Sequence, residues 1–436
     1  MRASLRRSAL ELCVFPFLLC GVVSLNGSVL AADLIVDGSG GGDFEFIQDA
    51  IGAAVDGDRV LVRSGTYEEN VDFVGKDIVV ESESGANSTI IDGTDSGSVV
   101  TFQGGEPSSA VLRGFTLTGG SGTFYESNIR GGAVFCLQSS PTIEDCAFVE
   151  NMADYAAGMY VDTCSPVVRG CSFLRNESLT YGGGIAGPDA LIEIYDCYFE
   201  ENRAIAGDGV LHLALASPIE DCVFVNNRSR AGGAINSGGA GADFSIRRCQ
   251  FFGNEATDLH GGAIRVHEAT CLIEECLFVD NFAALDGGAI MCIDGGSSLI
   301  QRCTFDRNGA GRFGGTVAAW NGARPGLDNS IVSGSTGGGG LYCSDASIEV
   351  VCSDVWENVG GNYTGGCPDM TGTDGNVSED PRWCAPDAGD YGLFNSSPCA
   401  PANSGGCDQI GAFGVECTDP SPVVHRSWGG IKAAYR

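Results

Sequence analysis

The chain has 436 residues, among them 66 glycines and 20 cysteines, and its 56 acidic side chains outnumber the 24 basic ones. Its length allows a large core, and so much glycine without a long amphipathic run favours short strands joined by tight turns. A formal net charge of −32 excludes a basic surface for nucleic acid and would repel an anionic membrane.

Residues 1–31 are predicted to be a secretion signal. Arg2, Arg6 and Arg7 precede the apolar residues 12–23, and residues 29–31 fit the small-residue rule of a cleavage site. No later segment has the ~20 apolar residues that a membrane-spanning helix needs. With the signal removed, 18 of the 20 cysteines remain. In an exported chain they indicate several disulfides and a secreted or cell-surface protein.

Residues 32–105 are expected to form an N-terminal cap and the first coils of a repeat. Apolar residues recur at helical spacing from residue 44 to residue 54, and Asp43 is a candidate N-cap. We expect this helix to cover the open edge of the first strands, which would otherwise pair with another chain. Strands are predicted at residues 59–63 and 70–73.

An internal repeat between residues 106 and 360 is the strongest signal. Each copy has a cysteine, a phenylalanine two residues later, an asparagine three residues after that, and then a segment similar to Gly-Gly-Ala-Ile. The steps between the cysteines are 25, 26, 25, 27, 27 and 27 residues. The repeated residues are Cys146, Cys171, Cys197, Cys222, Cys249, Cys276 and Cys303, with Asn151, Asn176, Asn202, Asn227, Asn254, Asn281 and Asn308. Weaker copies on either side bring the total to about ten coils.

This period predicts an all-β fold, a right-handed parallel β-helix, because a leucine-rich repeat needs its own leucine pattern and a propeller blade is longer. Equivalent side chains of successive coils then stack about 4.8 Å apart. Ile143, Cys146 and Phe148 would point inward as columns. Asn151 would begin a ladder in which each carboxamide donates to the next coil and accepts from the previous one. We therefore interpret the repeated residues as structural.

An outward column of side chains is predicted on the strand that follows each Gly-Gly pair. Its members would be Phe135, Tyr160, Ala186, Leu211, Asn236, Arg265, Met291 and Ala318. If exposed, this column would form an apolar binding surface. A covering loop and a one-residue shift of register are the alternatives.

Few residues suggest catalysis. His260 and His267 share one coil, and Arg265 and His267 are expected to face outward from one strand with Glu268 beside them. Arg265, His267 and Glu268 are therefore the weak catalytic candidates, as a cation, imidazole and carboxylate that could act on an acidic sugar. Ordinary exposed polar side chains are the alternative. His212 is expected to be a buried, hydrogen-bonded imidazole.

Metal sites have little support in the sequence. No Cys-x-x-Cys pair occurs, which argues against zinc and iron–sulfur sites. Carboxylate pairs such as Glu144–Asp145 and Glu274–Glu275 precede the repeated cysteine and would repel one another when stacked. Calcium could relieve this repulsion, but arginines interrupt the column. We expect no cofactor, with calcium as the alternative.

The remaining cysteines divide into two groups. The first group could bridge to the inward column, as could neighbouring members of that column with each other. The expected pairs join Cys136, Cys164, Cys271 and Cys292 to Cys146, Cys171, Cys276 and Cys303. The second group, Cys343 to Cys417, predicts a disulfide-stapled cap over the exit of the helix at residues 361–417. Residues 418–436 are interpreted as a linker and sorting tail, with a disordered remnant as the alternative.

Several segments carry a resemblance to known families. Residues 46–51, 56–60 and 65–70 (Gly-Thr-Tyr-Glu-Glu-Asn) resemble the opening of pectin-lyase-like β-helix proteins, including pectinesterases. The Phe-x-x-Asn and Gly-Gly-Ala-Ile elements resemble the repeats of polymorphic outer membrane proteins and of bacterial right-handed β-helix repeat proteins. Residues 376–417 resemble a common ending of such bacterial proteins. These resemblances imply the fold, whereas the catalytic motifs of pectinesterases, polygalacturonases and pectate lyases are not found in this sequence.

The sequence thus predicts a monomeric, secreted or surface-exposed β-helix protein with a structural, adhesive or glycan-binding role and no recognisable active site. Polysaccharides or other cell-surface molecules are its expected ligands. The alternative is a polysaccharide-active enzyme (lyase, esterase or hydrolase) of the pectin-lyase-like superfamily, since one fold can serve either role.

Overall fold

The computed structural model describes residues 31–213, 215, 217–239 and 242–418. Apart from residues 31 and 418, the predicted secretion signal and the predicted C-terminal tail lie outside these ranges. The unit that starts at Ala32 is described below.

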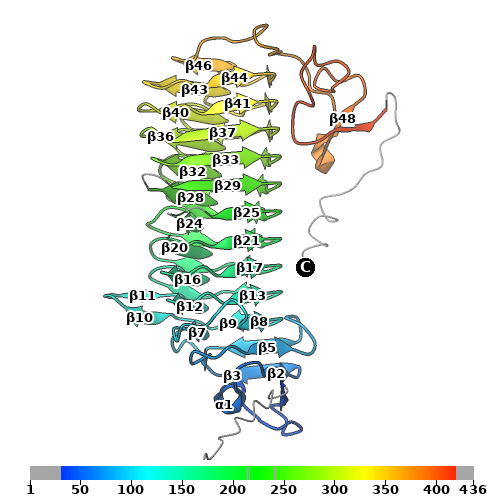
Figure 1. The fold of residues 1–436 in the computed structure, drawn as a ribbon. Coiled ribbons are helices and arrows are strands. Elements are labelled where there is room, and N and C mark those ends of the chain that lie inside the picture. Colours follow the sequence, from blue (N-terminus) through cyan, green and yellow to red (C-terminus); the bar gives the residue numbers. More distant parts are fainter. Residues whose placement is uncertain (1–30, 214, 216, 240–241, 419–436) are drawn as a thin grey trace, which may run out of the picture. The chain divides into compact units, whose positions relative to one another are not determined.

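Short parallel strands stack coil upon coil into three long sheets, here called sheets I, II and III (Figure 1). Sheet I has 13 strands: β1 (Asp33–Val36), β2 (Arg59–Val62), β5 (Val79–Ser82), β8 (Val111–Arg113), β13 (Thr142–Glu144), β17 (Val167–Arg169), β21 (Glu193–Tyr195), β25 (Pro218–Glu220), β29 (Asp243–Arg247), β33 (Thr270–Glu274), β37 (Ser297–Gln301), β41 (Gly326–Asp328) and β44 (Glu349–Val351). Sheet II has 12 strands: β4 (Val71–Asp72), β7 (Val100–Phe102), β12 (Val134–Leu137), β16 (Met159–Asp162), β20 (Ile185–Asp189), β24 (Leu211–Leu213), β28 (Ile235–Gly238), β32 (Ile264–His267), β36 (Ile290–Ile293), β40 (Val317–Trp320), β43 (Leu341–Ser344) and β46 (Tyr363–Gly365).

Sheet III also has 12 strands: β3 (Gly65–Glu68), β6 (Thr89–Asp92), β9 (Thr116–Thr118), β14 (Ala147–Val149), β18 (Ser172–Leu174), β22 (Tyr198–Glu200), β26 (Val223–Val225), β30 (Gln250–Phe252), β34 (Leu277–Val279), β38 (Thr304–Asp306), β42 (Ile331–Ser333) and β45 (Asp354–Trp356). A shorter sheet IV has seven two-residue strands: β15 (Met152–Ala153), β19 (Glu177–Ser178), β23 (Arg203–Ala204), β27 (Arg228–Ser229), β31 (Glu255–Ala256), β35 (Phe282–Ala283) and β39 (Gly309–Ala310). A hairpin, β10 (Thr123–Tyr125) and β11 (Asn128–Arg130), projects from one coil, and the C-terminal part forms β47 (Trp383–Ala385), the 3₁₀ helix η1 (Pro386–Ala388), β48 (Asp390–Phe394) and β49 (Val415–Cys417).

The core is a set of columns in which each side chain lies on its own copy in the next coil. The repeated phenylalanines, from Phe148 to Phe305, are fully buried. Their rings stack with centroids 4.2–4.9 Å apart and interplanar angles of 14° or less. Ring stacking at this distance follows from the strand spacing, because the rings occupy equivalent positions of paired parallel strands.

The repeated asparagines form a buried hydrogen-bonded ladder at the turns after sheet III. The Nδ2 group of Asn227 donates to Oδ1 of Asn254 in the next coil (3.0 Å) and to the Phe199 carbonyl (2.9 Å). Its Oδ1 accepts from the backbone N–H and from Nδ2 of Asn202 in the previous coil. Each carboxamide thus satisfies backbone groups that a solvent-free turn would otherwise leave unpaired.

The cysteines of the inward column are free thiols, and so are Cys136, Cys164, Cys271 and Cys292. The expected bridges between the two groups are therefore wrong in this structure. Each inward thiol instead donates to backbone carbonyls, as Cys222 does to Glu220 at 3.2 Å. A column of equivalent cysteines points the same way in every coil, so the geometry suits stacking and not bridging.

Arginines from adjacent coils bind the carboxylates that suggested calcium. Arg113 bonds Glu144 at 2.6 Å, Arg302 bonds Glu275 at 3.0 Å, and Arg248 bonds both Glu220 and Asp221. The repulsion between stacked carboxylates is thus relieved by guanidinium groups. In the part of the chain that the structure describes, no group of three or more histidine, cysteine or acidic side chains is arranged to hold a metal ion.

The helix near the N-terminus is shorter than predicted. Helix α1 (Ile47–Ala53) packs against β1, β2 and β4. Its N-cap residue is Phe46, so the prediction of Asp43 is wrong. The Glu69 carboxylate accepts hydrogen bonds from the free N–H groups of Ile47 and Gln48 at 2.8 and 2.9 Å. Glu69 therefore caps the helix as an N-cap side chain does, although it belongs to another segment.

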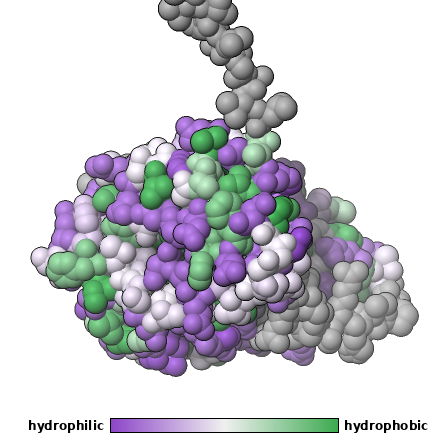
Figure 2. Space-filling model, turned by 90° about the horizontal axis from the view of Figure 1, so that it is seen from below, coloured by the Kyte–Doolittle hydropathy of each residue, from purple (hydrophilic) through white to green (hydrophobic). Residues whose placement is uncertain are grey.

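On the end of the unit where α1 lies, hydrophobic residues are interspersed with hydrophilic ones (Figure 2). Among the described residues, no helix is long and apolar enough to cross a membrane.

The cysteine-rich C-terminal segment has two parts. Cys367 and Met370 pack against the core at the last coil, whereas residues 383–417 pack on the side of the stack. Tyr391 donates a hydrogen bond to the buried Asp306 of β38 at 2.8 Å, and Leu393 and Ile410 form a buried cluster with Ile331 of β42. Part of the predicted cap therefore lies at the last coil, and the rest of it lies along the side of the stack. The disulfides of the C-terminal segment are Cys343–Cys367, Cys352–Cys407 and Cys384–Cys417, and Cys399 is a buried free thiol.

We predict that Asn227→Ala lowers the free energy of unfolding by about 4 kcal/mol, because four hydrogen bonds of roughly 1 kcal/mol each are lost in a buried turn. Denaturant unfolding followed by circular dichroism measures the change. The exposed Asn128 in the hairpin is the matched control, and Asn128→Ala should change the stability by less than about 0.5 kcal/mol. An equal decrease in the free energy of unfolding for the two substitutions would show that the asparagine ladder does not stabilise the fold.

We further predict that Asp354→Asn removes a pH dependence of stability. Asp354 is fully buried, and it accepts from the N–H of Glu379 (3.1 Å) and from the Cys399 thiol (3.3 Å). Burial raises the pKa of its carboxyl from 3.8 to about 7, with the charges of Glu379 and Asp380 adding to the increase. The folded state therefore binds a proton more tightly than the unfolded state, and stability falls as the pH rises from about 4 to about 7.

The loss from this one group is at most about 4 kcal/mol, at 1.36 kcal/mol per pKa unit. Melting temperatures measured by calorimetry at pH 5 and pH 8 should therefore differ more for the unsubstituted protein than for Asp354→Asn. The variant should be the more stable of the two at pH 8. A variant that is less stable at both pH values would contradict this account.

Candidate functional site

The outer face of sheet II carries the chemically richest set of side chains. The strand register pairs Ala186 with His212 and His212 with Asn236. His212 therefore occupies the outward column, and the expected member Leu211 faces the core. The predicted register was wrong by one residue at this coil. Of the predicted column, Phe135, Tyr160, Ala186, Met291 and Ala318 are buried, because a second layer of side chains covers them.

This second layer comes from the turns that lead into sheet II. In each turn one residue adopts a left-handed conformation, in most coils the glycine that begins the Gly-Gly pair, such as Gly182 (φ 67°) and Gly287 (φ 68°). The residue just before it projects over the sheet. We call these residues the turn column: Arg130, Tyr155, Tyr181, Asp208, Ala231, His260, Asp286 and Phe313. Direct bridges pair Arg130 with Tyr155 and Asp286 with Phe313.

At the N-terminal end of this face lies a cluster of tyrosines. Tyr155 contacts Tyr160 and Tyr181 with ring centroids 5.8 and 5.6 Å apart, and Tyr125 of the hairpin completes the cluster. The guanidinium carbon of Arg130 lies 5.0–5.8 Å from the centroids of Tyr125, Tyr155 and Tyr160. Burial raises the pKa of Tyr155 to about 12, with Arg130 opposing the increase. The cluster therefore presents neutral phenols around one cation.

A hydrogen-bonded network follows in the middle of the face. Asp208 accepts from Arg230 at 3.3 Å and from Arg265 at 3.4 Å, and Arg265 also donates to Oδ1 of Asn236 at 3.2 Å. Nδ2 of Asn236 lies 3.2 Å from Nδ1 of His212, whose ring packs on Tyr181. Burial lowers the pKa of His212 to about 4 although Asp208 opposes the shift. The imidazole is therefore neutral above about pH 5 and partly exposed, and it faces outward instead of into the core as expected.

A buried carboxylate lies in the next part of the face. Asp286 is fully buried; its Oδ2 lies 3.0 Å from Nδ1 of His260, and Nε of Arg312 donates to its Oδ1 at 2.9 Å. Burial raises the pKa of Asp286, but the bonds from Arg312 and His260 outweigh burial and leave the pKa below its ordinary value. The carboxylate is therefore ionised and orients both an imidazole and a guanidinium group. The Arg312 guanidinium also lies 5.0 Å from the Trp320 ring centroid.

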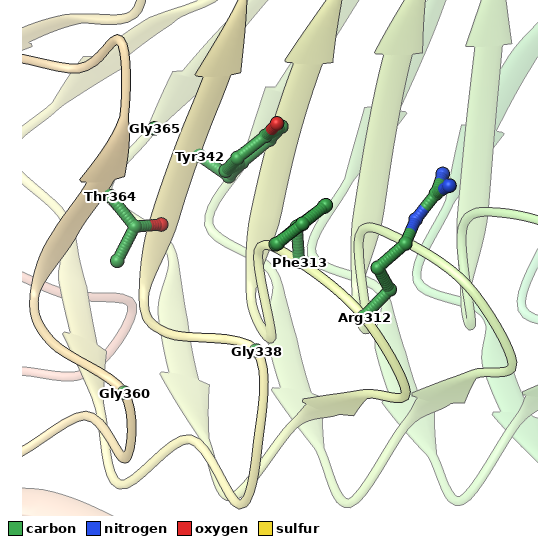
Figure 3. Close-up of a pocket in the computed structure, with 7 residues that line it drawn as sticks. All are labelled: Arg312, Phe313, Gly338, Tyr342, Gly360, Thr364 and Gly365. Atoms are coloured by element: carbon green, nitrogen blue, oxygen red, sulfur yellow. The ribbon is translucent and has the colours of Figure 1, made fainter.

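The C-terminal end of the face is hollowed into a pocket of about 590 Å³ (Figure 3). Arg312 and Phe313 extend from one turn and Tyr342 from β43 of the next coil, and Thr364 lies at the other end of the pocket. The rings of Phe313 and Tyr342 are parallel within 6°, with centroids 4.5 Å apart. Phe313 remains 39% exposed. The other lining residues are Gly338, Gly360 and Gly365, which leave room in front of the rings.

The three candidate catalytic residues do not form one group. Arg265 and His267 both face outward from β32, but Arg265 binds Asp208 whereas His267 lies 3.0 Å from Asp294 in the next coil. Glu268 is exposed in the turn that follows, with φ at 53°. Instead of the expected cation–imidazole pair, Arg265 and His267 each contact a different aspartate. Sequence reasoning noted His260 but gave it no role, and it missed Asp286, Arg312 and Phe313. The position of His260, Asp286 and Phe313 just before each glycine pair is a signal that could have identified the turn column.

Several solved structures are similar to this chain at low sequence identity. Pectate lyase Pel9A is 14% identical, with 89% of this chain and 97% of that chain covered and a TM-score of 0.47. A GH87 α-1,3-glucanase from Streptomyces thermodiastaticus is 15% identical, covering 76% and 65% of the two chains at a TM-score of 0.43. Pectin methylesterase from carrot is 13% identical, covering 74% and 89% at a TM-score of 0.36. No curated protein matches the chain.

The sequence profile described as "Right handed beta helix region" matches residues 78–257 and 233–362, which together make up more than half of the chain. These matches span the coils whose stacked columns and outer face are described above. The chain belongs to the family of right-handed parallel β-helix proteins.

Proposed function

We propose that this protein is an extracellular polysaccharide-binding β-helix, and that a neutral glycan lies along the outer face of sheet II. The observation that carries the proposal is the parallel Phe313–Tyr342 pair in the pocket beside Arg312. Partly exposed aromatic rings in a pocket with a few oriented polar groups are typical of sites that bind small polar molecules with apolar faces. A sugar ring has such a face, since its C–H groups lie on one side and its hydroxyls at the edge.

The arrangement along the stack suits a polymer. The tyrosine cluster, the Asp208–Arg265–Asn236 network and the pocket lie on one sheet, in coils that succeed one another at the strand spacing of about 4.8 Å. A chain molecule that follows the stack would meet aromatic faces at both ends and hydrogen-bonding groups between them. The disulfides of the C-terminal segment support an extracellular location for such binding.

Charge favours a neutral glycan over an acidic one. Each of these arginines on this face has a carboxylate partner, because Asp208 binds Arg230 and Arg265, Asp286 binds Arg312 and Glu126 binds Arg130. The whole chain carries a formal net charge of −32, so a polyanion would be repelled over its length. Neutral hydroxyls can use the remaining donors of these guanidinium groups without that cost.

We predict that Phe313→Ala and Tyr342→Ala each weaken glycan binding about tenfold, since a lost aromatic contact of about 1.4 kcal/mol corresponds to that factor. The measurement is isothermal titration calorimetry with the best ligand from an array of neutral and acidic oligosaccharides. Phe282→Ala is the matched control, because Phe282 is comparably exposed (42%) on sheet IV. It should bind as tightly as the unsubstituted protein.

Two outcomes would contradict this proposal. Equal loss of affinity in the Phe282→Ala control would show that the pocket is not the site. Preferred binding of polyuronates that weakens steeply with added salt would contradict the neutral ligand, because screening acts on charged partners.

A polysaccharide-active enzyme is the second candidate, favoured by the His260–Asp286 pair. A buried carboxylate that orients a partly exposed imidazole is an arrangement found in general acid–base catalysis. Arg312, on the same carboxylate, could stabilise negative charge that develops on a substrate.

If the chain is an enzyme, Asp286→Asn should reduce turnover at least about 100-fold, the usual contribution of a positioned acid–base group. Purified protein is incubated with the same polysaccharides, and new reducing ends and unsaturated products are measured. His267→Ala tests the catalytic candidate that was predicted from the sequence separately from the His260–Asp286 pair, because His267 does not contact Asp286. Turnover lost only in His267→Ala would contradict the assignment to Asp286, and no turnover on any polysaccharide would leave binding as the function.

A further inference from the structure

Two buried thiols outside the inward cysteine column lie close to each other. Cys136 is on β12, and Cys164 is in the turn that follows β16 in the next coil. Their Sγ atoms are 3.6 Å apart. Cys136 is fully buried, whereas Cys164 retains 6% of its surface. They belong to neighbouring coils but to positions that are not equivalent, because the strand register pairs Cys136 with Val161.

The surroundings of these thiols fix their positions. The Cys136 thiol donates to the Ser139 carbonyl (3.2 Å), and Sγ of Cys164 accepts from the Ser139 N–H (3.2 Å). Oγ of Ser139 in turn donates to the buried Glu106 carboxylate at 2.6 Å. One turn therefore orients both sulfur atoms. Hydrogen bonding from Cys136 and from the Ser139 N–H outweighs burial and lowers the pKa of the Cys164 thiol, whereas the pKa of Cys136 is raised.

We propose that Cys136 and Cys164 are an oxidisable pair that forms a fourth disulfide in the exported protein. The sulfur atoms need to approach from 3.6 Å to the bonded distance of about 2 Å, which rotations of the two side chains can supply. Twelve of the described cysteines are free thiols, and Cys136 and Cys164 are two of them whose sulfur atoms meet from non-equivalent positions of neighbouring coils.

The oxidant is a disulfide, either a small molecule such as oxidised glutathione or a thiol–disulfide exchange protein. The Cys164 thiolate attacks one sulfur of the oxidant, and one half of the oxidant leaves as a thiolate. Cys136 then loses its proton and attacks the Cys164 sulfur of the mixed disulfide, releasing the second half. One Cys136–Cys164 bond forms, one oxidant bond breaks, and the protons from the two cysteines pass to the released thiolates. Cys164 is the less buried of the two thiols, and its lowered pKa makes it the attacking group.

The bond would tie together two coils that form part of the proposed glycan site. Cys136 follows Phe135 on β12, and Cys164 lies two residues after Asp162, which accepts from Tyr160 at 3.1 Å. Phe135 stacks on Tyr160 of the tyrosine cluster. The disulfide itself rests on the structure and not on the proposed function, so glycan binding and disulfide formation can fail independently.

Peptide mapping tests the pairing. The protein is equilibrated with oxidised glutathione, denatured, alkylated with iodoacetamide and cleaved after glutamate and arginine. Arg130, Glu144, Glu150 and Arg169 then place Cys136, Cys146, Cys164 and Cys171 on different peptides. We expect residues 131–144 to be cross-linked to residues 151–169, and ten alkylated cysteines instead of the twelve free thiols of the reduced structure. Alkylation of both Cys136 and Cys164, or a bond from either to Cys146 or Cys171, would overturn the proposal.

Single substitutions give a second readout that does not depend on stability. Cys136→Ser should leave Cys164 open to alkylation in denaturant, and Cys164→Ser should do the same for Cys136. Cys197→Ser, in the inward column, is the matched control and should leave the cross-link intact. Loss of the cross-link in the control, or its persistence on a new partner in either variant, would show that the pairing is not specific.

Discussion

The hydrogen bonding of parallel strands at a fixed spacing is the constraint on which the rest of this structure depends. Once the coils are set about 4.8 Å apart, any side chain repeated in register must contact its own copy. Flat rings meet this requirement by stacking, and carboxamides meet it because each has a donor and an acceptor. Thiols meet it by bonding to nearby carbonyls. The core is therefore assembled from residue types that tolerate a neighbour identical to themselves.

Identical neighbours are a difficulty for charged residues, and the chain relieves it by pairing opposite charges from adjacent coils. Arg248 binds Glu220 and Asp221 of the preceding coil, and on sheet IV Glu177 binds Arg203 and Arg228 binds Glu255. The outer face of sheet II uses the same compensation, with buried aspartates beside arginines. The result is a face with many hydrogen-bonding groups and little net charge on a strongly acidic protein.

The fold could be predicted from the sequence because its signal is repeated in fixed register. Cys146, Phe148 and Asn151 recur with the same internal spacing, so the inward positions of one coil fix those of the next. Positions without a repeated residue type could not be inferred in this way. His212 was placed one residue out of register because its coil departs from the Gly-Gly-Ala-Ile pattern, and Asp286 and Phe313 share a structural position but no chemistry.

Contacts between segments far apart in the sequence were also beyond prediction. Glu69 caps helix α1 across more than 20 residues, and Tyr391 bonds Asp306 across 85 residues. Neither contact has a local pattern, since each depends on how the chain returns to the stack. The turn column is an intermediate case. The position of the turn column follows from the left-handed residues. The residue types at this position vary from coil to coil, and these variable side chains form the candidate site.

The asparagine ladder has a consequence for how such a protein can change in length. Between Cys222 and Cys303 every coil has 27 residues and offers the same carboxamide, ring and thiol to both neighbours. Removing or duplicating one of these coils would join surfaces that already match, so tandem duplication in the gene can lengthen the core without a new interface. The outer network of Asp208, Asn236 and Arg265 spans coils of different composition, so the same event would change the ligand face. Core and face are thus free to evolve at different rates.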